Sequence, residues 1–345
     1  MTDLGTTYLG LSLRSPLVAS ASPHNRDADH ARRLEAAGAA ALVMPSLFEE
    51  EVIHEETSLT RALEAGADHF AEALDYFPDV GDYPSARDRY VEAVAAIKAA
   101  VDIPVIASLN ATHPGSWVSY AHLLADAGAD AVELNLYRVA ADPFRSAAEV
   151  EESDLATIAD VANTLAVPVA VKLSPYYSSF ANFGMRAVEV GAAGLVLFNR
   201  FYQPDLDLDE MAPDARITLS QPWELRLPLR WLAILHPHLG GRASLAATTG
   251  IWTGADVVKA LLVGADVAMM TSALLHHGPD HVAAVETELA SWLETRGYTS
   301  VAEARGSVSY ATTDDPSAFE RANYISTLRS WTAPPEFSPS SPPGR

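Results

Sequence analysis

The sequence predicts a (β/α)8 barrel, also called a TIM barrel, and an internal repeat is the first observation behind that prediction. A helical pattern that ends in Gly-Ala and runs into a short apolar strand occurs four times, at residues 35–44, 127–135, 190–199 and 263–270. Glycine just past a helix allows a left-handed C-cap, and a short apolar run after it is typical of a buried strand. The repeat therefore indicates helices that alternate with buried strands.

The number of strands is the second observation. Two apolar runs with a proline near their start, at 101–109 and 166–173, and two further runs, at 16–20 and 243–249, bring the total to eight. Helical patterns fill the intervals and follow the last strand, at about 27–38, 86–100, 117–127, 148–165, 179–190, 223–236, 254–263 and 280–296. Eight alternating units predict the barrel. A doubly wound open sheet is the alternative, but no G-x-G-x-x-G follows the first strand.

Two segments lie outside this alternation. Residues 46–85 separate the second strand from its helix, and we expect them to form a cover over the barrel mouth. From about Thr332 the chain is rich in proline and serine, a composition typical of disorder. The sequence therefore predicts one barrel domain over residues 1–331 and a disordered tail over 332–345.

The composition excludes several classes of function. A formal net charge of −22 opposes binding to nucleic acid or to an anionic membrane, because both need a basic surface. The chain has no cysteine, which excludes disulfides, thiolate metal sites and a cysteine nucleophile. We find no apolar run that approaches a membrane span of about 18 residues and no secretory signal, so we expect a cytoplasmic protein.

Lys172 directs the search for a site. It is one of three lysines in the chain and stands inside the apolar run 167–175. A buried cation costs free energy unless an anion meets it, and in a barrel the C-terminal end of a strand is where ligands bind. Its partner is therefore either a bound ligand or Glu133 on the neighbouring predicted strand, and the two could coexist.

Amides and hydroxyls gather at the C-terminal ends of the predicted strands, where the catalytic groups of a barrel lie. Besides Lys172 they comprise Ser20, Ser22, Ser46, Ser108, Asn110, Glu133, Asn135, Ser174, Asn199, Arg200, Thr248 to Gly250, Thr271 and Ser272. The set contains no pair of aspartates and no histidine cluster, so we expect no metal site. After strands seven and eight, where barrels frequently hold a phosphate, Gly250 would admit the phosphate to the backbone, and Thr271 and Ser272 would donate to it.

These residues resemble those of the flavin-dependent dihydroorotate dehydrogenases of class 1, and above all the group of dihydroorotate dehydrogenase-like proteins. The matching stretches are 46–50, 103–110, 133–137, 169–175, 197–205, 228–231 and 264–266, within a resemblance that runs from about residue 3 to 330. The resemblance implies a TIM barrel with FMN at its C-terminal mouth and a small-molecule substrate. It also implies a homo-oligomer or a pairing with a separate electron-transfer protein.

Carried over residue by residue, the resemblance places Lys172 at the N1/O2 edge of the flavin, where a cation stabilises the anionic reduced ring. It implies catalytic roles for Lys172 and Asn135, with Tyr137 as the candidate for proton transfer. Arg138 and Arg200 would hold a substrate carboxylate, because a guanidinium fork suits that group. The residues expected to contact FMN are Ser20, Ala21, Ser22, Ser46, Asn110, Asn135, Lys172, Asn199, Gly250, Thr271 and Ser272.

Three positions depart from the enzymes that oxidise dihydroorotate. Pro45 stands in place of a second lysine, Arg138 in place of a cysteine or serine base, and Thr249 in place of one of two paired glycines. Arginine cannot act as a base near neutral pH. We therefore expect an FMN-dependent oxidoreductase that passes hydride between a CH–CH substrate and flavin N5. Two alternatives stay open: a true dihydroorotate dehydrogenase of pyrimidine biosynthesis with an altered base, and a redox-inactive barrel that acts as a binding partner.

Overall fold

The protein folds into a closed barrel of eight parallel strands. The computed structural model describes residues 2–55, 57, 85–110, 114–200, 204–214, 216–320 and 324–330. The strand order around the barrel is β11-β12-β3-β4-β5-β6-β7-β8, so strands that are consecutive along the chain are neighbours in space. Their bounds are Leu17–Ala19 (β3), Ala41–Phe48 (β4), Val105–Asn110 (β5), Ala131–Asn135 (β6), Val169–Leu173 (β7), Gly194–Leu197 (β8), Ser244–Ala247 (β11) and Val267–Met270 (β12). The closed barrel confirms the predicted fold class.

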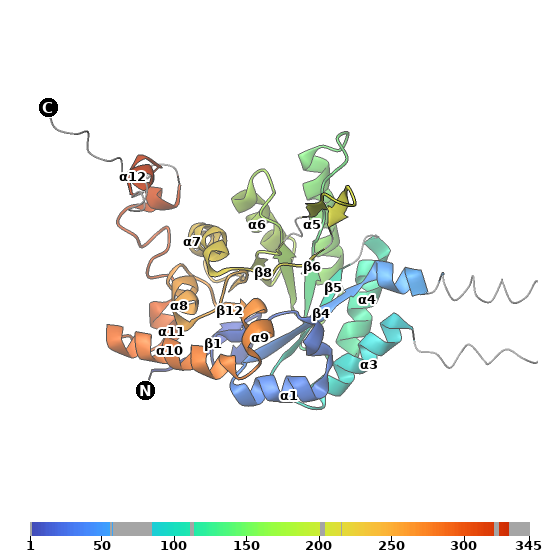
Figure 1. Cartoon of the computed structure of the whole chain (residues 1–345), viewed down its shortest axis with the longest axis horizontal. Helices are drawn as coiled ribbons and strands as arrows, with labels where there is room; N and C mark the ends of the chain where they lie inside the picture. Colours follow the sequence, from blue (N-terminus) through green and yellow to red (C-terminus); the bar gives the residue numbers. More distant parts are fainter. Residues whose placement is uncertain are drawn as a thin grey trace, which may run out of the picture.

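Eight helices follow the eight strands in the described part of the chain and cover the outside of the barrel (Figure 1). They are α1 (Ala28–Ala37), α3 (Ala86–Lys98), α4 (Pro114–Asp126), α5 (Ala147–Ala162), α6 (Phe180–Glu189), α7 (Arg226–Leu239), α8 (Gly254–Leu262) and α10 (His281–Arg296). The predicted ranges differ from these bounds by no more than three residues at either end. Capping boxes at Ser85, Ser146 and Thr253 fix the starts of α3, α5 and α8, because each side chain satisfies an otherwise unpaired backbone N–H.

The Gly-Ala repeats have the backbone conformation that their pattern predicts. The φ angles of Gly38, Gly128, Gly191 and Gly264 are 110°, 100°, 119° and 112°, all in the left-handed region. Each glycine therefore ends a helix and turns the chain back toward the next strand. One local sequence rule, used four times, sets four of the seven helix-to-strand connections of the barrel.

A hairpin that the sequence pattern does not predict lies at the N-terminal end of the barrel. Strands β1 (Thr6–Tyr8) and β2 (Leu11–Leu13) pair antiparallel, and Tyr8, Leu9 and Leu13 join the apolar cluster inside the barrel. The backbone N–H of Leu9 donates to Ser244 Oγ at 2.9 Å, at the first residue of β11. The hairpin thus packs against the starts of the strands, and the cavity described below lies at their C-terminal ends.

Strand β4 contains an irregularity at Pro45, one of the three departures noted above. Its pairing with β5 shifts between Val43 and Ser46, as expected where proline supplies no N–H to the ladder. The Tyr90 hydroxyl donates to the Pro45 carbonyl at 2.7 Å and accepts from Ser108 N–H at 3.1 Å, so it ties β4 to β5 across the gap. The proline is therefore built into the strand pairing.

Several short elements occur besides the barrel strands and the eight helices that follow them. They are a hairpin of β9 (Asp205–Asp207) and β10 (Ala212–Asp214), the helices α9 (Ser272–His277), α11 (Val301–Ala304) and α12 (Tyr324–Arg329), and the 3₁₀ turns η1 (Pro23–Arg26), η3 (Pro222–Leu225) and η4 (Pro316–Phe319). Of the predicted cover, residues 49–55 are helical, whereas residues 56 and 58–84 lie outside the described residues, as does the predicted tail 332–345. None of the described helices has the length and apolar character that a bilayer crossing requires.

Two of the repeat glycines allow a matched test of the packing behind α7. An alanine Cβ at Gly264 would overlap the ring of His236 on α7, whereas at Gly128 its nearest neighbour would be Lys98 Cγ at an ordinary 3.6 Å. Both substitutions carry the cost of a left-handed alanine, about 1–2 kcal/mol. We expect Gly264→Ala to lower the free energy of unfolding by clearly more than Gly128→Ala, as measured by urea denaturation. Equal losses would contradict a tight contact between Gly264 and His236.

Candidate functional site

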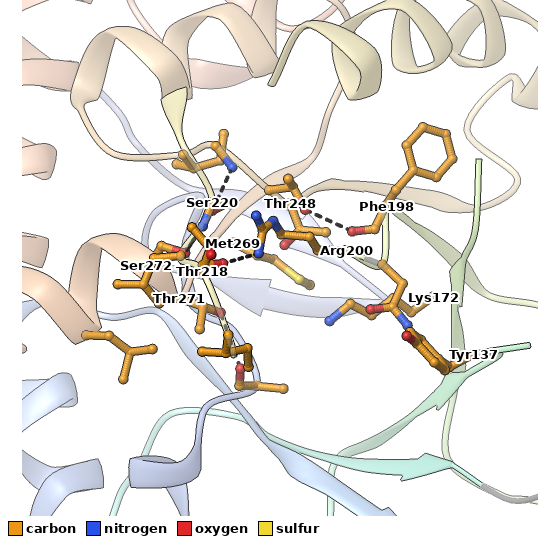
Figure 2. Close-up of a pocket in the computed structure, with 18 of the residues that line it drawn as sticks. Tyr137, Lys172, Phe198, Arg200, Thr218, Ser220, Thr248, Met269, Thr271 and Ser272 are labelled. Atoms are coloured by element: carbon orange, nitrogen blue, oxygen red, sulfur yellow. Dashed lines mark hydrogen bonds between the residues drawn. The ribbon is translucent and has the colours of Figure 1, made fainter. Parts of the chain in front are cut away.

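A cavity of about 870 Å³ opens at the C-terminal ends of the barrel strands (Figure 2). Its walls come from the ends of six strands and from the segment before α7. The lining residues are Ala21, Pro23, Tyr137, Lys172, Phe198, Asn199, Arg200, Arg216, Ile217, Thr218, Leu219, Ser220, Thr248, Thr249, Gly250, Ile251, Met269, Thr271, Ser272 and Leu275. Its size falls within the range of about 300–1,000 Å³ that is typical of small-molecule sites.

Lys172 lies at one side of this cavity, on β7. Its ammonium group is 3.6 Å from Glu133 Oε1 on the neighbouring strand β6, and Glu133 itself is fully buried. Figure 2 shows the lysine side chain directed toward the middle of the cavity, beside Tyr137. The ion pair that the sequence offered as an alternative is thus present, and the same lysine also faces the space where a ligand would bind.

Hydrogen bonds connect the amides and hydroxyls predicted at the strand ends into a row beside the cavity. Asn199 Nδ2 donates to Asn135 Oδ1 at 2.6 Å, and Asn135 Nδ2 donates to Ser46 Oγ at 3.3 Å. Ser46 and Ser108 share a hydrogen bond of 2.8 Å, and Asn110 Nδ2 donates to the Asn135 carbonyl at 2.9 Å. Asn199 lines the cavity, and Asn135, Ser46 and Asn110 stand behind it. The row fixes the orientation of the Asn199 amide through residues of three strands, β4, β5 and β6.

Serine hydroxyls and backbone N–H groups meet at the side of the cavity opposite Lys172 (Figure 2). Ser220 N–H donates to Ser272 Oγ at 3.0 Å, the two hydroxyls lie 2.8 Å apart, and Gly250 N–H donates to Ser220 Oγ at 3.4 Å. Thr271 Oγ1 donates to the Ala21 carbonyl at 3.3 Å. The cluster thus brings the two loops predicted for phosphate together with the segment before η3.

Thr249 and Gly250 form the turn after β11. Both have left-handed backbones, with φ of 73° and 80°. A Cβ at Gly250 would lie 2.7 Å from the backbone nitrogen of Leu225, so the glycine is required by the close approach of η3. Thr249 adopts the conformation that glycine would take, and its hydroxyl donates to the Phe198 carbonyl at 3.1 Å. That bond offsets part of the backbone strain at this departure from the family pattern.

The two candidate arginines have different positions. Arg200 lines the cavity, pairs with Glu224 at 3.1 Å and donates to the Thr218 carbonyl. Arg138 is not among the lining residues and turns toward α5, where its guanidinium lies 3.4 Å from Asp154. Burial raises the pKa of Asp154, and the positive charge of Arg138 opposes that rise. The binding of a substrate carboxylate by Arg138 stays a prediction, and here its charge is engaged by Asp154.

The remaining predicted residues surround the cavity at different depths. Ala21 lines it, as do Tyr137, Gly250, Thr271 and Ser272. Ser20 is buried behind the surface, and its hydroxyl has no hydrogen-bond partner among the described residues. Ser22 caps the turn η1 by accepting from His24 N–H at 3.3 Å, which is a structural role. No group of three potential metal-ligand side chains occurs in the described part of the chain.

Sequence reasoning missed one wall of the cavity, the segment 216–220. Arg216, Ile217, Thr218, Leu219 and Ser220 all line it, and they precede η3 and α7. The signal that could have found them is the long interval between the sixth strand and its helix, because loops of that length in a compact domain are commonly functional. Phe198 and Met269 were missed for another reason, since apolar strand-end residues look the same in sequence whether they line a cavity or the core.

Comparison with known proteins identifies the family. Residues 85–293 match the family model for dihydroorotate dehydrogenase, which is more than half of the chain. The chain belongs to the dihydroorotate dehydrogenase family. It is therefore an oxidoreductase of the dihydroorotate dehydrogenase-like group that acts on CH–CH groups, and proteins of this family are flavoproteins.

Individual relatives agree with this membership. A protein of Aeropyrum pernix assigned as dihydroorotate dehydrogenase A (fumarate) is 30% identical over 59% of this chain and 67% of its own length. The catalytic subunit of dihydroorotate dehydrogenase B (NAD(+)) of Thermoplasma acidophilum is 26% identical over 89% of this chain and 99% of its own. A dihydroorotate dehydrogenase (quinone) of Xanthobacter autotrophicus is 30% identical, but the alignment spans only 40% of each chain. The three relatives carry different electron acceptors in their names.

Two substitutions of Thr249 test whether the left-handed backbone at this position is strained. We expect Thr249→Ala to lower the free energy of unfolding by about 1 kcal/mol, because it loses the bond to Phe198 and keeps the left-handed backbone. Thr249→Gly loses the same bond but relieves strain worth about 1–2 kcal/mol, part of which the greater freedom of unfolded glycine cancels. Chemical denaturation should therefore find the glycine variant at least as stable as the alanine variant. The opposite order would show that strain does not matter here.

Proposed function

We propose that this protein binds FMN in the cavity at the barrel mouth and uses it in hydride transfer to or from a CH–CH bond of a small substrate. The observation that carries the proposal is the polarity of the cavity. A buried lysine stands at one side, and a cluster of hydroxyls and N–H groups from two loops and the segment 216–220 stands at the other. FMN has the matching polarity, with a ring that becomes anionic on reduction and a phosphate at its far end.

The cavity residues fit FMN along its length. Gly250, Ser220 and Ser272 would hold the phosphate through backbone N–H and hydroxyl groups. Apolar side chains of the cavity wall, such as Met269 and Ile251, would suit the flat ring. When bound, FMN would supply hydride exchange at its N5 atom. Lys172 would place positive charge beside the edge of the ring where negative charge accumulates, and the surrounding burial strengthens that effect.

Tyr137 and Arg200 are the residues proposed to act on the substrate. Tyr137 lines the cavity next to Lys172, where its hydroxyl could exchange a proton with a substrate carbon or heteroatom. Arg200 lines the same space and could hold an anionic substrate, with Glu224 keeping its guanidinium in place. The amide of Asn199, oriented by Asn135, offers a hydrogen bond to either ligand.

The identity of the substrate and its pathway require a separate experiment. Dihydroorotate is the substrate in the names of several relatives, and complementation of a pyrimidine auxotroph would test a role for this protein in pyrimidine biosynthesis. A homo-oligomer, a separate electron-transfer partner and a cytoplasmic location stay predictions.

Charge placed at the phosphate end tests the proposed orientation of FMN. We expect Ser272→Asp to weaken FMN binding by about a hundredfold, equivalent to about 2.8 kcal/mol, because a carboxylate would face the phosphate. Riboflavin, which has no phosphate, should bind both proteins to a similar extent. Flavin fluorescence titration measures both affinities, and Ser291→Asp on the exposed face of α10 is the control.

Two outcomes would contradict the proposal. If the purified protein shows no flavin absorption and takes up no FMN on reconstitution, the function itself is wrong. If FMN binds but Ser272→Asp weakens riboflavin equally, the phosphate lies elsewhere in the cavity.

A further inference from the structure

We propose that Glu133, which stands below the cavity, is a positioning residue that sets how much of the Lys172 charge reaches a ligand. The inference rests on the proposed function and deepens it. Glu133 is fully buried inside the barrel on β6, and it does not line the cavity. Lys172 is the cation beside it, with its nitrogen 3.6 Å from Oε1. The carboxylate would therefore act through the lysine.

Glu133 depends on Lys172 because no other group in the described part of the chain compensates the cost of burying its carboxylate. Neither carboxylate oxygen accepts a hydrogen bond from any described residue. Most side chains inside the barrel are apolar, among them Val43, Ile106, Val196 and Met269, and the residue that pairs with Glu133 on β5 is Ser108, which is neutral. An ionised carboxylate in such surroundings is costly unless a cation pairs with it.

Tyr8 is the polar group that approaches from the opposite side, on the hairpin at the base of the barrel. Its hydroxyl is buried without a hydrogen-bond partner among the described residues. Burial raises the pKa of Tyr8 well above its usual value, and the negative charge of Glu133 raises it further. Tyr8 therefore stays neutral and supplies no charge that could replace Lys172.

The geometry of the pair leaves the lysine available to a ligand. A distance of 3.6 Å is longer than the roughly 2.7–2.9 Å of a charge-assisted hydrogen bond, so Lys172 is attracted to Glu133 but not locked onto it. An ammonium group has three donors, and the side chain of Lys172 points into the cavity. Lys172 thus lies between the buried carboxylate of Glu133 and the space where a ligand would bind. Both the carboxylate and an anionic ligand would attract its ammonium group.

A purely structural role explains this arrangement poorly. Apolar residues of similar volume usually stabilise a core as well as a buried ion pair does, or better. An acid placed directly below the one lysine of the cavity instead attracts the ammonium group away from a bound ring, so that less of the positive charge would reach the ring. In the proposed flavoprotein, Glu133 would therefore hold the reduction potential of FMN below the value that Lys172 alone would give.

Redox titration of the FMN-loaded protein tests this inference. We expect Glu133→Gln to favour the reduced form of FMN over the oxidised form by about tenfold more than the unmodified protein does, which is a rise of about 30 mV for a two-electron couple. Lys172→Met should shift the potential in the opposite direction. In the Lys172→Met background, Glu133→Gln should change the potential by much less, because its effect passes through the lysine. Glu133→Asp keeps the charge and should stay nearer the unmodified value than Glu133→Gln.

Asp130→Asn is the matched control. Asp130 directly precedes the same strand and pairs with Lys98 at 2.6 Å outside the barrel, so its loss should leave the potential unchanged. An unchanged potential in Glu133→Gln would overturn the inference. An equal rise in both lysine backgrounds would also overturn it, since Glu133 would then act on the ring directly.

Thermal unfolding of the FMN-free protein separates this inference from the proposed function. Lys172→Met alone should unfold at a lower temperature than the double variant Lys172→Met/Glu133→Gln, because only the single variant leaves a buried carboxylate without its cation. If no variant binds FMN, the function fails while this comparison still decides whether the two residues act as a pair. Additive effects of the two substitutions on the melting temperature would overturn the pairing.

Discussion

The ion pair between Lys172 and Glu133 is the constraint around which the mouth of the barrel is organised. Both residues project into the barrel from adjacent strands, where most neighbours are apolar and a single charge would be costly. Burial of the carboxylate makes the lysine necessary, and the lysine in turn brings positive charge to the surface of the cavity. The same contact therefore compensates a buried carboxylate and places a cation at the cavity.

The rest of the cavity adds neutral polar groups to that charge. Hydroxyls and N–H groups on the loops after β11 and β12, together with the segment before η3, form the opposite side. The row of Asn199, Asn135, Ser46 and Ser108 connects four strands near the lysine and orients one amide toward the cavity. At the other end of the barrel the β1–β2 hairpin packs against the starts of the strands. Packing thus fills one end of the barrel, and the cavity lies at the other.

Each departure from the pattern of dihydroorotate-oxidising enzymes has a local structural accommodation. Pro45 lies at an irregularity of β4 that Tyr90 bridges, and Thr249 takes a left-handed conformation with its hydroxyl bonded to Phe198. Arg138 pairs with the buried Asp154, which also accepts from the Tyr177 hydroxyl at 2.9 Å. The positions that would carry a second lysine and a base thus belong to packing and pairing networks.

The sequence by itself determined the eight strands, their helices and the place of Lys172, because these depend on local rules. Glycine after a helix, apolar runs and a charge within such a run are all visible in neighbouring residues. Only the tertiary structure decided that Arg138 turns to Asp154, that segment 216–220 lines the cavity and that a hairpin packs into the barrel base. Those outcomes depend on contacts between residues far apart in the chain. Long side chains and loops follow the partners that folding brings to them, and no local pattern records which partner that is.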